Sequence, residues 1–190
     1  MSTRSQRHVL VGVTGGIAAY KTAELVSRLI KRGDLVTVAM TDAATRFIGV
    51  ETFSSLSGRP VLREPWGAFE DHESQHVALA GQVDIMVVSP CSMNSLSKFA
   101  AGFASDMVSL LVAAIDRAET PVLLAPSMNA AMWNQPATQR HVATLQQDGF
   151  TVLMPETGWQ ACRTEGCGRL PETSSLIEAI DAAIIHPQSS

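Results

Sequence analysis

Residues 9–21 read VLVGVTGGIAAYK, and this stretch decides the fold. Its first five residues form an apolar run that is typical of a buried parallel strand, and Gly15 and Gly16 predict a tight turn after it. Apolar residues then recur at helical spacing over residues 17–31, and a second apolar run covers residues 35–40. A strand, a helix and a second strand in this order predict a βαβ unit, which requires a parallel pair.

The alternation of strand and helix continues along the chain. We expect further strands at residues 85–89, 122–125 and 150–154, and helices from about Ala43, through His76 and Leu79, and at residues 95–101, 106–114, 138–148 and 174–185. This order predicts an α/β fold with a doubly wound parallel sheet and right-handed crossovers. Prolines and glycines indicate a surface loop over residues 51–73. We expect one domain over residues 1–186 and a disordered tail at residues 187–190.

The composition points to a compact cytoplasmic protein that forms oligomers. Of 190 residues, 46% are hydrophobic and only 17% are charged, which favours a large core and apolar contacts between subunits. The net charge of −4 and the lack of a basic cluster argue against nucleic-acid binding. No apolar run approaches the roughly 20 residues that span a bilayer, and no signal-peptide pattern is present. The three cysteines are too few for a disulfide framework.

Hydroxyl side chains stand at the predicted carboxyl ends of three strands, namely Thr14, Thr41 and Ser89. Because the carboxyl ends of parallel strands meet at one edge of the sheet, we expect a shared ligand crevice there. A glycine turn before a helix can bind phosphate through free amides and the helix dipole. The glycines of residues 12–16 lack the G-x-G-x-x-G spacing of dinucleotide sites, so a mononucleotide is favoured. Taken alone, the turn could equally be free of ligand.

Two later segments offer polar groups with two interpretations each. In residues 90–94, PCSMN, Ser92 and Asn94 could hydrogen-bond the carbonyl and imide groups of a ligand or could cap the next helix. Asp106 follows a break at Gly102 and fits a helix N-cap better than a ligand contact.

The loop at residues 126–133, PSMNAAMW, follows the fourth predicted strand. It places the amide of Asn129 among two methionines and a tryptophan, a composition suited to holding a flat apolar ring and one polar group. The alternative is a methionine-rich turn that belongs to the core.

Two histidines, His72 and His76, are four residues apart on a short predicted helix. A third metal ligand is not evident, so we expect no metal site. A single histidine is more often a surface or core residue, although it is also the natural proton carrier near neutral pH.

A thiol stands in a segment, residues 157–170, that shows neither a helical nor a strand period. Cys162 is followed by Gly166 and Gly168, which suggests a glycine-hinged flap that carries the thiol. Cys167 could be an inert neighbour, a disulfide partner or the functional thiol. The flap's two arginines, at positions 163 and 169, could steady an anionic substrate or simply face solvent.

Together these motifs resemble those of the flavin-dependent cysteine decarboxylase family over nearly the whole chain. VTGGIAAYK at 13–21 is similar to the family's flavin-phosphate turn, and PCSMNS at 90–95 to its PASANT motif. PSMNAAMW at 126–133 matches PxMNxxMW at every fixed position, and ACRTEGCGR at 161–169 resembles the substrate clamp of the coenzyme A branch. The resemblance implies a flavodoxin-like or Rossmann-like three-layer fold that binds FMN between the subunits of a trimer, sometimes assembled into a dodecamer.

The implied reaction is the decarboxylation of 4'-phosphopantothenoylcysteine to 4'-phosphopantetheine in coenzyme A biosynthesis. Departure of CO₂ leaves electrons that an N-acylcysteine cannot delocalise. Oxidation of the thiol-bearing carbon to a thioaldehyde by the flavin supplies that electron sink, and re-reduction follows the loss of CO₂.

The resemblance also implies roles for single residues. Asn129 would hold the substrate carboxylate, His76 would assist thiol oxidation and Cys162 would donate the last proton. Met132 and Gly166 would join Asn129 in contacting the substrate. The residues expected around FMN are Thr14, Gly15, Gly16, Ile17, Ala18, Thr41, Phe47, Ser89, Ser92, Asn94 and Asp106. The sequence departs from the family pattern at Cys91, Met93, Ser95 and Arg163, which affects packing beside the flavin and the mobility of the clamp.

Two other functions are compatible with parts of the pattern. A peptidyl-cysteine oxidative decarboxylase would share the turn, His76 and Asn129 but would need no thiol in the clamp, so Cys162 argues against it. A regulatory FMN-binding subunit could keep PSMNAAMW and bind a protein partner without catalysis. Retention of all three catalytic candidates favours an enzyme.

Overall fold

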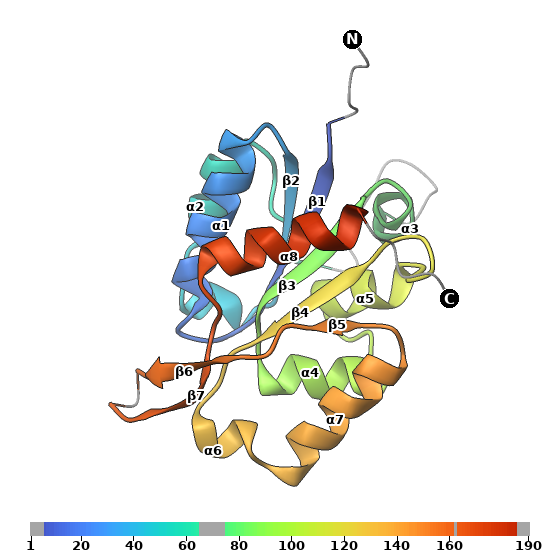
Figure 1. Ribbon diagram of the computed structural model, residues 1–190. Helices are drawn as coiled ribbons and strands as arrows, with labels where there is room; N and C mark the ends of the chain where they lie inside the picture. The colour runs from blue at the N-terminus through green and yellow to red at the C-terminus, as the bar shows by residue number, and fades with distance from the viewer. Residues whose placement is uncertain (1–5, 65–74, 162, 186–190) are drawn as a thin grey trace.

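The sheet has five parallel strands, which confirms the predicted parallel sheet, and their order is β2-β1-β3-β4-β5 (Figure 1). The computed structural model describes residues 6–64, 75–161 and 163–185. The strands are β1 (His8–Val13), β2 (Leu35–Met40), β3 (Ile85–Cys91), β4 (Val122–Pro126) and the short β5 (Thr151–Val152). Strands β1 and β3 are neighbours although β2 and several helices separate them in sequence, so the direction of strand addition reverses between them.

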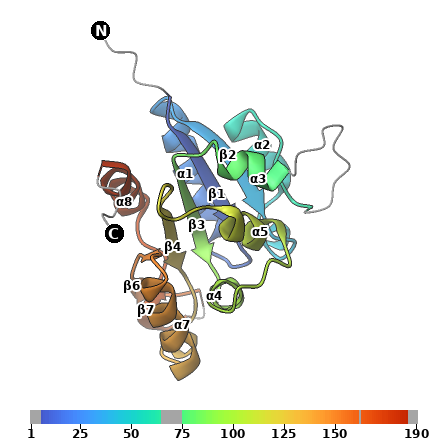
Figure 2. The ribbon, with the colours of Figure 1, turned by 90° about the vertical axis from the view of Figure 1, so that its right-hand side faces the viewer.

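Helices cover both faces of the sheet and form a three-layer sandwich (Figure 2). Side chains alternate between the faces along each strand. One face packs against α1 (Ala19–Lys31), α2 (Val50–Ser57) and α8 (Thr173–Ile185). The other face packs against α3 (Gln75–Ala80), α4 (Met93–Ala100), α5 (Met107–Ala114), the one-turn α6 (Ala130–Trp133) and α7 (Pro136–Gln147). The part of the chain that the structure describes contains no helix long and apolar enough to cross a bilayer.

The predicted surface loop at residues 51–73 was wrong in its first part. Residues 50–57 form α2, and the helix expected from about Ala43 is a single 3-10 turn, η1 (Ala44–Arg46), before it. The sequence signal was weak because α2 buries a single large side chain completely, that of Phe53. Gly58 ends the helix in the left-handed conformation, with φ of 67°. Residues 65–74 lie outside the described part, as does the expected tail.

A second correction concerns residues 157–170, where we expected no strand. The segment forms an antiparallel hairpin of β6 (Glu156–Trp159) and β7 (Glu165–Arg169). The hairpin lies beyond the carboxyl edge of the main sheet, near α6 (Figure 1). Its strands, ETGW and EGCGR, contain few apolar side chains and none that alternate along the strand, so the sequence carries no apolar period-2 pattern.

The burial of Phe53 provides a test of the corrected fold. Replacement Phe53→Ala removes a fully buried ring and should lower the free energy of unfolding by about 3–5 kcal/mol. Phe103, which is 62% exposed, is the matched control, and Phe103→Ala should change stability by no more than about 0.5 kcal/mol. Urea denaturation followed by circular dichroism measures both, and equal losses would contradict the packing of α2.

Candidate functional site

A cavity of about 610 Å³ opens at the carboxyl edge of the sheet, where the sequence places the crevice. Its wall is built from the β1–α1 turn, the β3–α4 loop, the β4–α6 loop and the β6–β7 hairpin. The turn and the β3–α4 loop follow β1 and β3, between which the strand order reverses, and open α/β sheets bind ligands at such a switch point. The predicted residues that line the cavity are Gly15, Gly16, Ile17, Ala18, Ser92, Asn129 and Met132.

The remaining predicted residues lie outside the lining of this cavity. They are Thr14, Thr41, Phe47, His76, Ser89, Asn94, Asp106 and Gly166, while Cys162 is not among the described residues. Sequence reasoning assigned no role to Tyr20, Lys21, Trp159 and Gln160, which do line it. Tyr20 and Lys21 could have been found from their position in the first turn of α1, directly after the glycines.

Thr14 is fully buried and joins the two central strand ends. Its hydroxyl donates to the carbonyl oxygen of Pro90 at 2.7 Å and accepts from the amide of Ser92 at 2.8 Å. Ser89 is also fully buried, and its carbonyl oxygen accepts a 2.7 Å bond from the hydroxyl of Thr22 on α1. These hydroxyls therefore hold the turn and the β3–α4 loop in place.

The glycine turn has little room on one side and open space on the other. A Cβ on Gly15 would lie 2.6 Å from the Cβ of Ala43, whereas a Cβ on Gly16 would meet only Pro90, at 4.0 Å. The first amides of a helix have no partner within the helix. At the start of α1 the amides of Ala19 and Lys21 already donate to the carbonyl oxygens of Gly16 and Ala18, at 3.0 Å each. An anion in the cavity would therefore meet the turn itself, whose residues Gly15 to Ala18 line the cavity.

Ser92 and Asp106, two of the predicted polar residues, act as helix caps. The hydroxyl of Ser92 accepts from the amide of Ser95 at the start of α4. Asp106 forms a capping box with Ser109 at the start of α5 and an ion pair of 2.7 Å with Lys98. The N-cap interpretation of Asp106 is thereby confirmed, and Ser92 both caps a helix and faces the cavity.

Asn129 is the N-cap of α6, and its Oδ1 accepts from the amide of Ala131 at 2.8 Å. This bond fixes the side chain at the cavity wall. Met132 is 42% exposed and lines the cavity, whereas Trp133 is buried in the core. The loop therefore contributes both to the cavity wall, through Asn129 and Met132, and to the core, through Trp133.

The hairpin docks on this loop through two glycines. The amide of Met128 donates to the carbonyl oxygen of Gly168 at 3.0 Å. Any Cβ on Gly168 would lie 2.1 Å from the carbonyl oxygen of Met128, and one on Gly166 would lie 2.8 Å from the Cβ of Ala130. The side chain of Gln160 accepts from the amide of Ala130 at 3.3 Å. The two glycines are thus needed for close backbone packing as much as for a hinge.

Two thiols of the chain are engaged in packing. Burial raises the pKa of the Cys91 thiol far above its usual range, so this thiol does not form a thiolate near neutral pH. Cys167 packs against the core, and its Sγ donates to the carbonyl oxygen of Pro155 at 3.4 Å. At the hairpin tip, Arg163 has a φ of +63°, a left-handed conformation that glycine adopts more readily. This explains why Arg163 is a costly departure from the resembled clamp.

His76 lies on α3, is partly buried and stands apart from the cavity on this chain. His72, its predicted neighbour on the helix, lies outside the described residues. Within residues 6–64, 75–161 and 163–185, no group of three or more His, Cys, Asp or Glu side chains could hold a metal ion.

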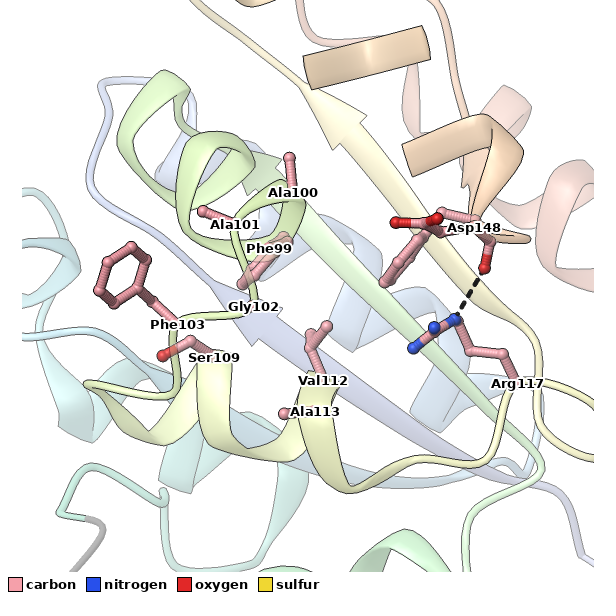
Figure 3. Close-up of a pocket in the computed structure, with 11 residues that line it drawn as sticks. Phe99, Ala100, Ala101, Gly102, Phe103, Ser109, Val112, Ala113, Arg117 and Asp148 are labelled. Carbon is pink, nitrogen blue, oxygen red and sulfur yellow. Dashed lines mark hydrogen bonds between the residues drawn. The ribbon is translucent and has the colours of Figure 1, made fainter. Parts of the chain in front are cut away.

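A second pocket, of about 390 Å³, lies between α4, α5 and the end of α7 (Figure 3). There the guanidinium of Arg117 stacks 4.4 Å from the centroid of the Phe150 ring and donates from Nε to the carbonyl oxygen of Asp148 at 3.1 Å. None of the predicted site residues lines this pocket. The cavity at the carboxyl edge is therefore the better candidate.

Comparison with known sequences places the chain among flavoproteins. The model of the Flavoprotein family matches residues 1–185. The coenzyme A biosynthesis bifunctional protein CoaBC of Mycolicibacterium smegmatis is 43% identical over 173 residues, which cover 90% of this chain and 40% of that protein. CoaBC of Bacillus subtilis is 36% identical over 174 residues, covering 92% and 42%. The chain thus spans about two fifths of the length of these curated relatives.

Solved structures with the same fold include cysteine decarboxylases. A mutant PPC decarboxylase complexed with pantothenoylaminoethenethiol superposes with a TM-score of 0.84 at 25% identity, covering 93% of this chain and 97% of that one. The FMN-dependent cysteine decarboxylase SpaF has a TM-score of 0.81 at 28% identity, with coverage of 97% and 99%. These likenesses confirm the predicted fold class.

The contact between Gly168 and Met128 can be tested directly. Gly168→Ala places a methyl group against a carbonyl oxygen and strains a backbone with φ of +145°, so it should separate the hairpin from the loop at a cost of roughly 1–3 kcal/mol. Hydrogen exchange of the Met128 amide should accelerate. Gly158→Ala on the same hairpin, where the nearest atom would be 3.5 Å away, should leave that exchange rate unaltered. Unaltered exchange in Gly168→Ala would contradict the docking.

Proposed function

The chain belongs to the Flavoprotein family, and on this basis we propose that it binds FMN and decarboxylates 4'-phosphopantothenoylcysteine to 4'-phosphopantetheine in coenzyme A biosynthesis. The observation that carries the proposal is the cavity at the β1/β3 switch point, which Asn129 of the PSMNAAMW loop and the hairpin both line. Support comes from CoaBC relatives at 36–43% identity and from the structural likeness to cysteine decarboxylases.

The residues present fit FMN. The volume of about 610 Å³ lies within the range of about 300–1,000 Å³ for small-molecule sites. The open side of Gly16 in the turn before α1 suits the phosphate, and Ser92 offers a polar group for the ring system. Ile17, Ala18 and Met132 supply apolar contacts at the same wall. We propose that the predicted residues outside the lining, such as Thr14 and Ser89, act by positioning these loops.

The role of FMN, when bound, is to accept a hydride from the thiol-bearing carbon of the substrate and to return it after CO₂ has left. Asn129 orients the substrate carboxylate. Its Oδ1 accepts from the amide of Ala131, and its Nδ2 is a donor of the type that a carboxylate oxygen accepts. Cys162, which lies between β6 and β7 in sequence, donates the proton that completes the saturated product.

We propose that the site is shared between subunits of a homo-oligomer, as a trimer or a dodecamer. Several large apolar side chains near the cavity are exposed on the single chain: Ile17, Tyr20, Met132 and Trp159. Exposed apolar patches of this kind mark interaction surfaces. His76 stands apart from the cavity on its own chain, so a second copy is the route by which it would reach a substrate there.

Product mass tests the proposed reaction. Incubation of the FMN-loaded protein with 4'-phosphopantothenoylcysteine should yield a product lighter by one CO₂. A further loss of two hydrogens would instead indicate an oxidative cysteine decarboxylase. An unaltered substrate would favour a non-catalytic FMN-binding role and contradict the proposal.

Two substitutions separate the steps of the reaction. Cys162→Ser should accumulate the oxidised enethiol, because it removes the proton donor of the last reduction. Asn129→Asp should reduce decarboxylation by roughly a hundredfold, since a second carboxylate repels that of the substrate. Mass spectrometry distinguishes the two variants, because one accumulates the oxidised enethiol and the other leaves the substrate carboxylate in place. Normal product from Cys162→Ser would assign the proton to another group, with Cys167 the next candidate.

A further inference from the structure

The cavity carries two positive charges to which the roles above assign no purpose. Among the residues that the structure describes, Lys21 of α1 and Arg169 of β7 are the only charged groups in its lining, and both are cations. Their partners stand outside the lining. The Oε1 atom of Glu172 lies 3.6 Å from Nζ of Lys21 and also accepts from Nη2 of Arg169. One carboxylate therefore bridges both cations.

The guanidinium of Arg169 has donor capacity to spare. Its bond to Glu172 and its 3.2 Å bond to Oε2 of Glu156 both start from the same nitrogen, Nη2. Its Nε is buried and has no hydrogen-bond partner in the described part of the chain. A guanidinium presents its donors as a planar fork that matches the oxygens of a phosphate. Arg169 can therefore donate more hydrogen bonds than it donates to Glu156 and Glu172, and an anion with several acceptor oxygens could accept them.

We propose that Arg169 and Lys21 form a subsite for the phosphate group of the substrate, and that Glu172 occupies these two cations until the substrate binds. The inference rests on the proposed function. A phosphate dianion carries more charge than a carboxylate and accepts stronger charge-assisted bonds from the same donors. The side chain of Glu172 is 51% exposed, and exposed ion pairs are individually weak, so the phosphate can displace it.

The position of Arg169 favours the phosphate of the substrate over that of FMN. Arg169 belongs to the hairpin that docks on the loop of Asn129, and both residues line the cavity, so Arg169 lies near the group proposed to hold the substrate carboxylate. The Gly15–Gly16 turn already offers backbone amides to the phosphate of FMN. Two ligands that each carry a phosphate need two anion sites, and the cation pair provides the second.

The experiment compares 4'-phosphopantothenoylcysteine with pantothenoylcysteine, which lacks the phosphate, on the FMN-loaded protein. The ratio of their kcat/KM values cancels general damage to the fold. We expect Arg169→Met and Lys21→Met each to lower this ratio about tenfold or more, and Glu172→Gln to raise it, because the competing carboxylate is gone. Arg140→Met, on the exposed surface of α7, is the matched control and should keep the wild-type ratio. The FMN content of each variant is measured in parallel.

A ratio that stays at the wild-type value in Arg169→Met would overturn the subsite. Loss of FMN with an unaltered ratio would also overturn it, because the cations would then belong to the flavin. If the wild-type protein converts neither substrate, the proposed reaction fails, and calorimetric titration with 4'-phosphopantetheine and pantetheine still tests the subsite. The affinity ratio of these two ligands should then fall in Arg169→Met, and an equal ratio would refute the inference.

Discussion

The buried hydroxyl of Thr14 is the contact on which the architecture of the site depends. It bonds both the carbonyl oxygen of Pro90 and the amide of Ser92, and so ties the end of β1 to the loop after β3. These two strands are the neighbours between which the strand order reverses, where loops diverge and a crevice opens. With the two loops held at a fixed separation, the glycine turn and Ser92 face one cavity.

The β6–β7 hairpin forms a part of the cavity wall that the loops at the strand ends do not form. Its contact with the loop after β4 is backbone to backbone, at Met128 and Gly168, so the loop of Asn129 and the segment around Cys162 are mechanically joined. A movement of the hairpin relative to this loop would strain or break the contact. The loop of Asn129 and strand β7 are thereby parts of one unit, and Arg169 follows directly after Gly168, the glycine of this contact.

Much of the fold could be predicted from the sequence because the central strands are continuous apolar runs and the first glycine turn is unambiguous. Helix α2 and the hairpin could not, because one buried phenylalanine and a set of glycines leave no periodic signal. The position of Asn129 and Ser92 at the cavity could be predicted because both residues follow the carboxyl ends of parallel strands, where ligand sites form. The structural role of Thr14 could not be predicted. A threonine at a strand end gives the same sequence signal whether its hydroxyl binds a ligand or another loop. His76 shows a further limit, because the place proposed for it in a second subunit's site cannot be derived from a single chain.

The account stands on the claim that the cavity at the carboxyl edge of the sheet is an FMN site. Fluorescence titration of the purified protein with FMN tests it most directly. The account predicts saturable uptake that ends at one FMN per chain and gives a yellow protein. A colourless protein that takes up no FMN over the whole titration would contradict it.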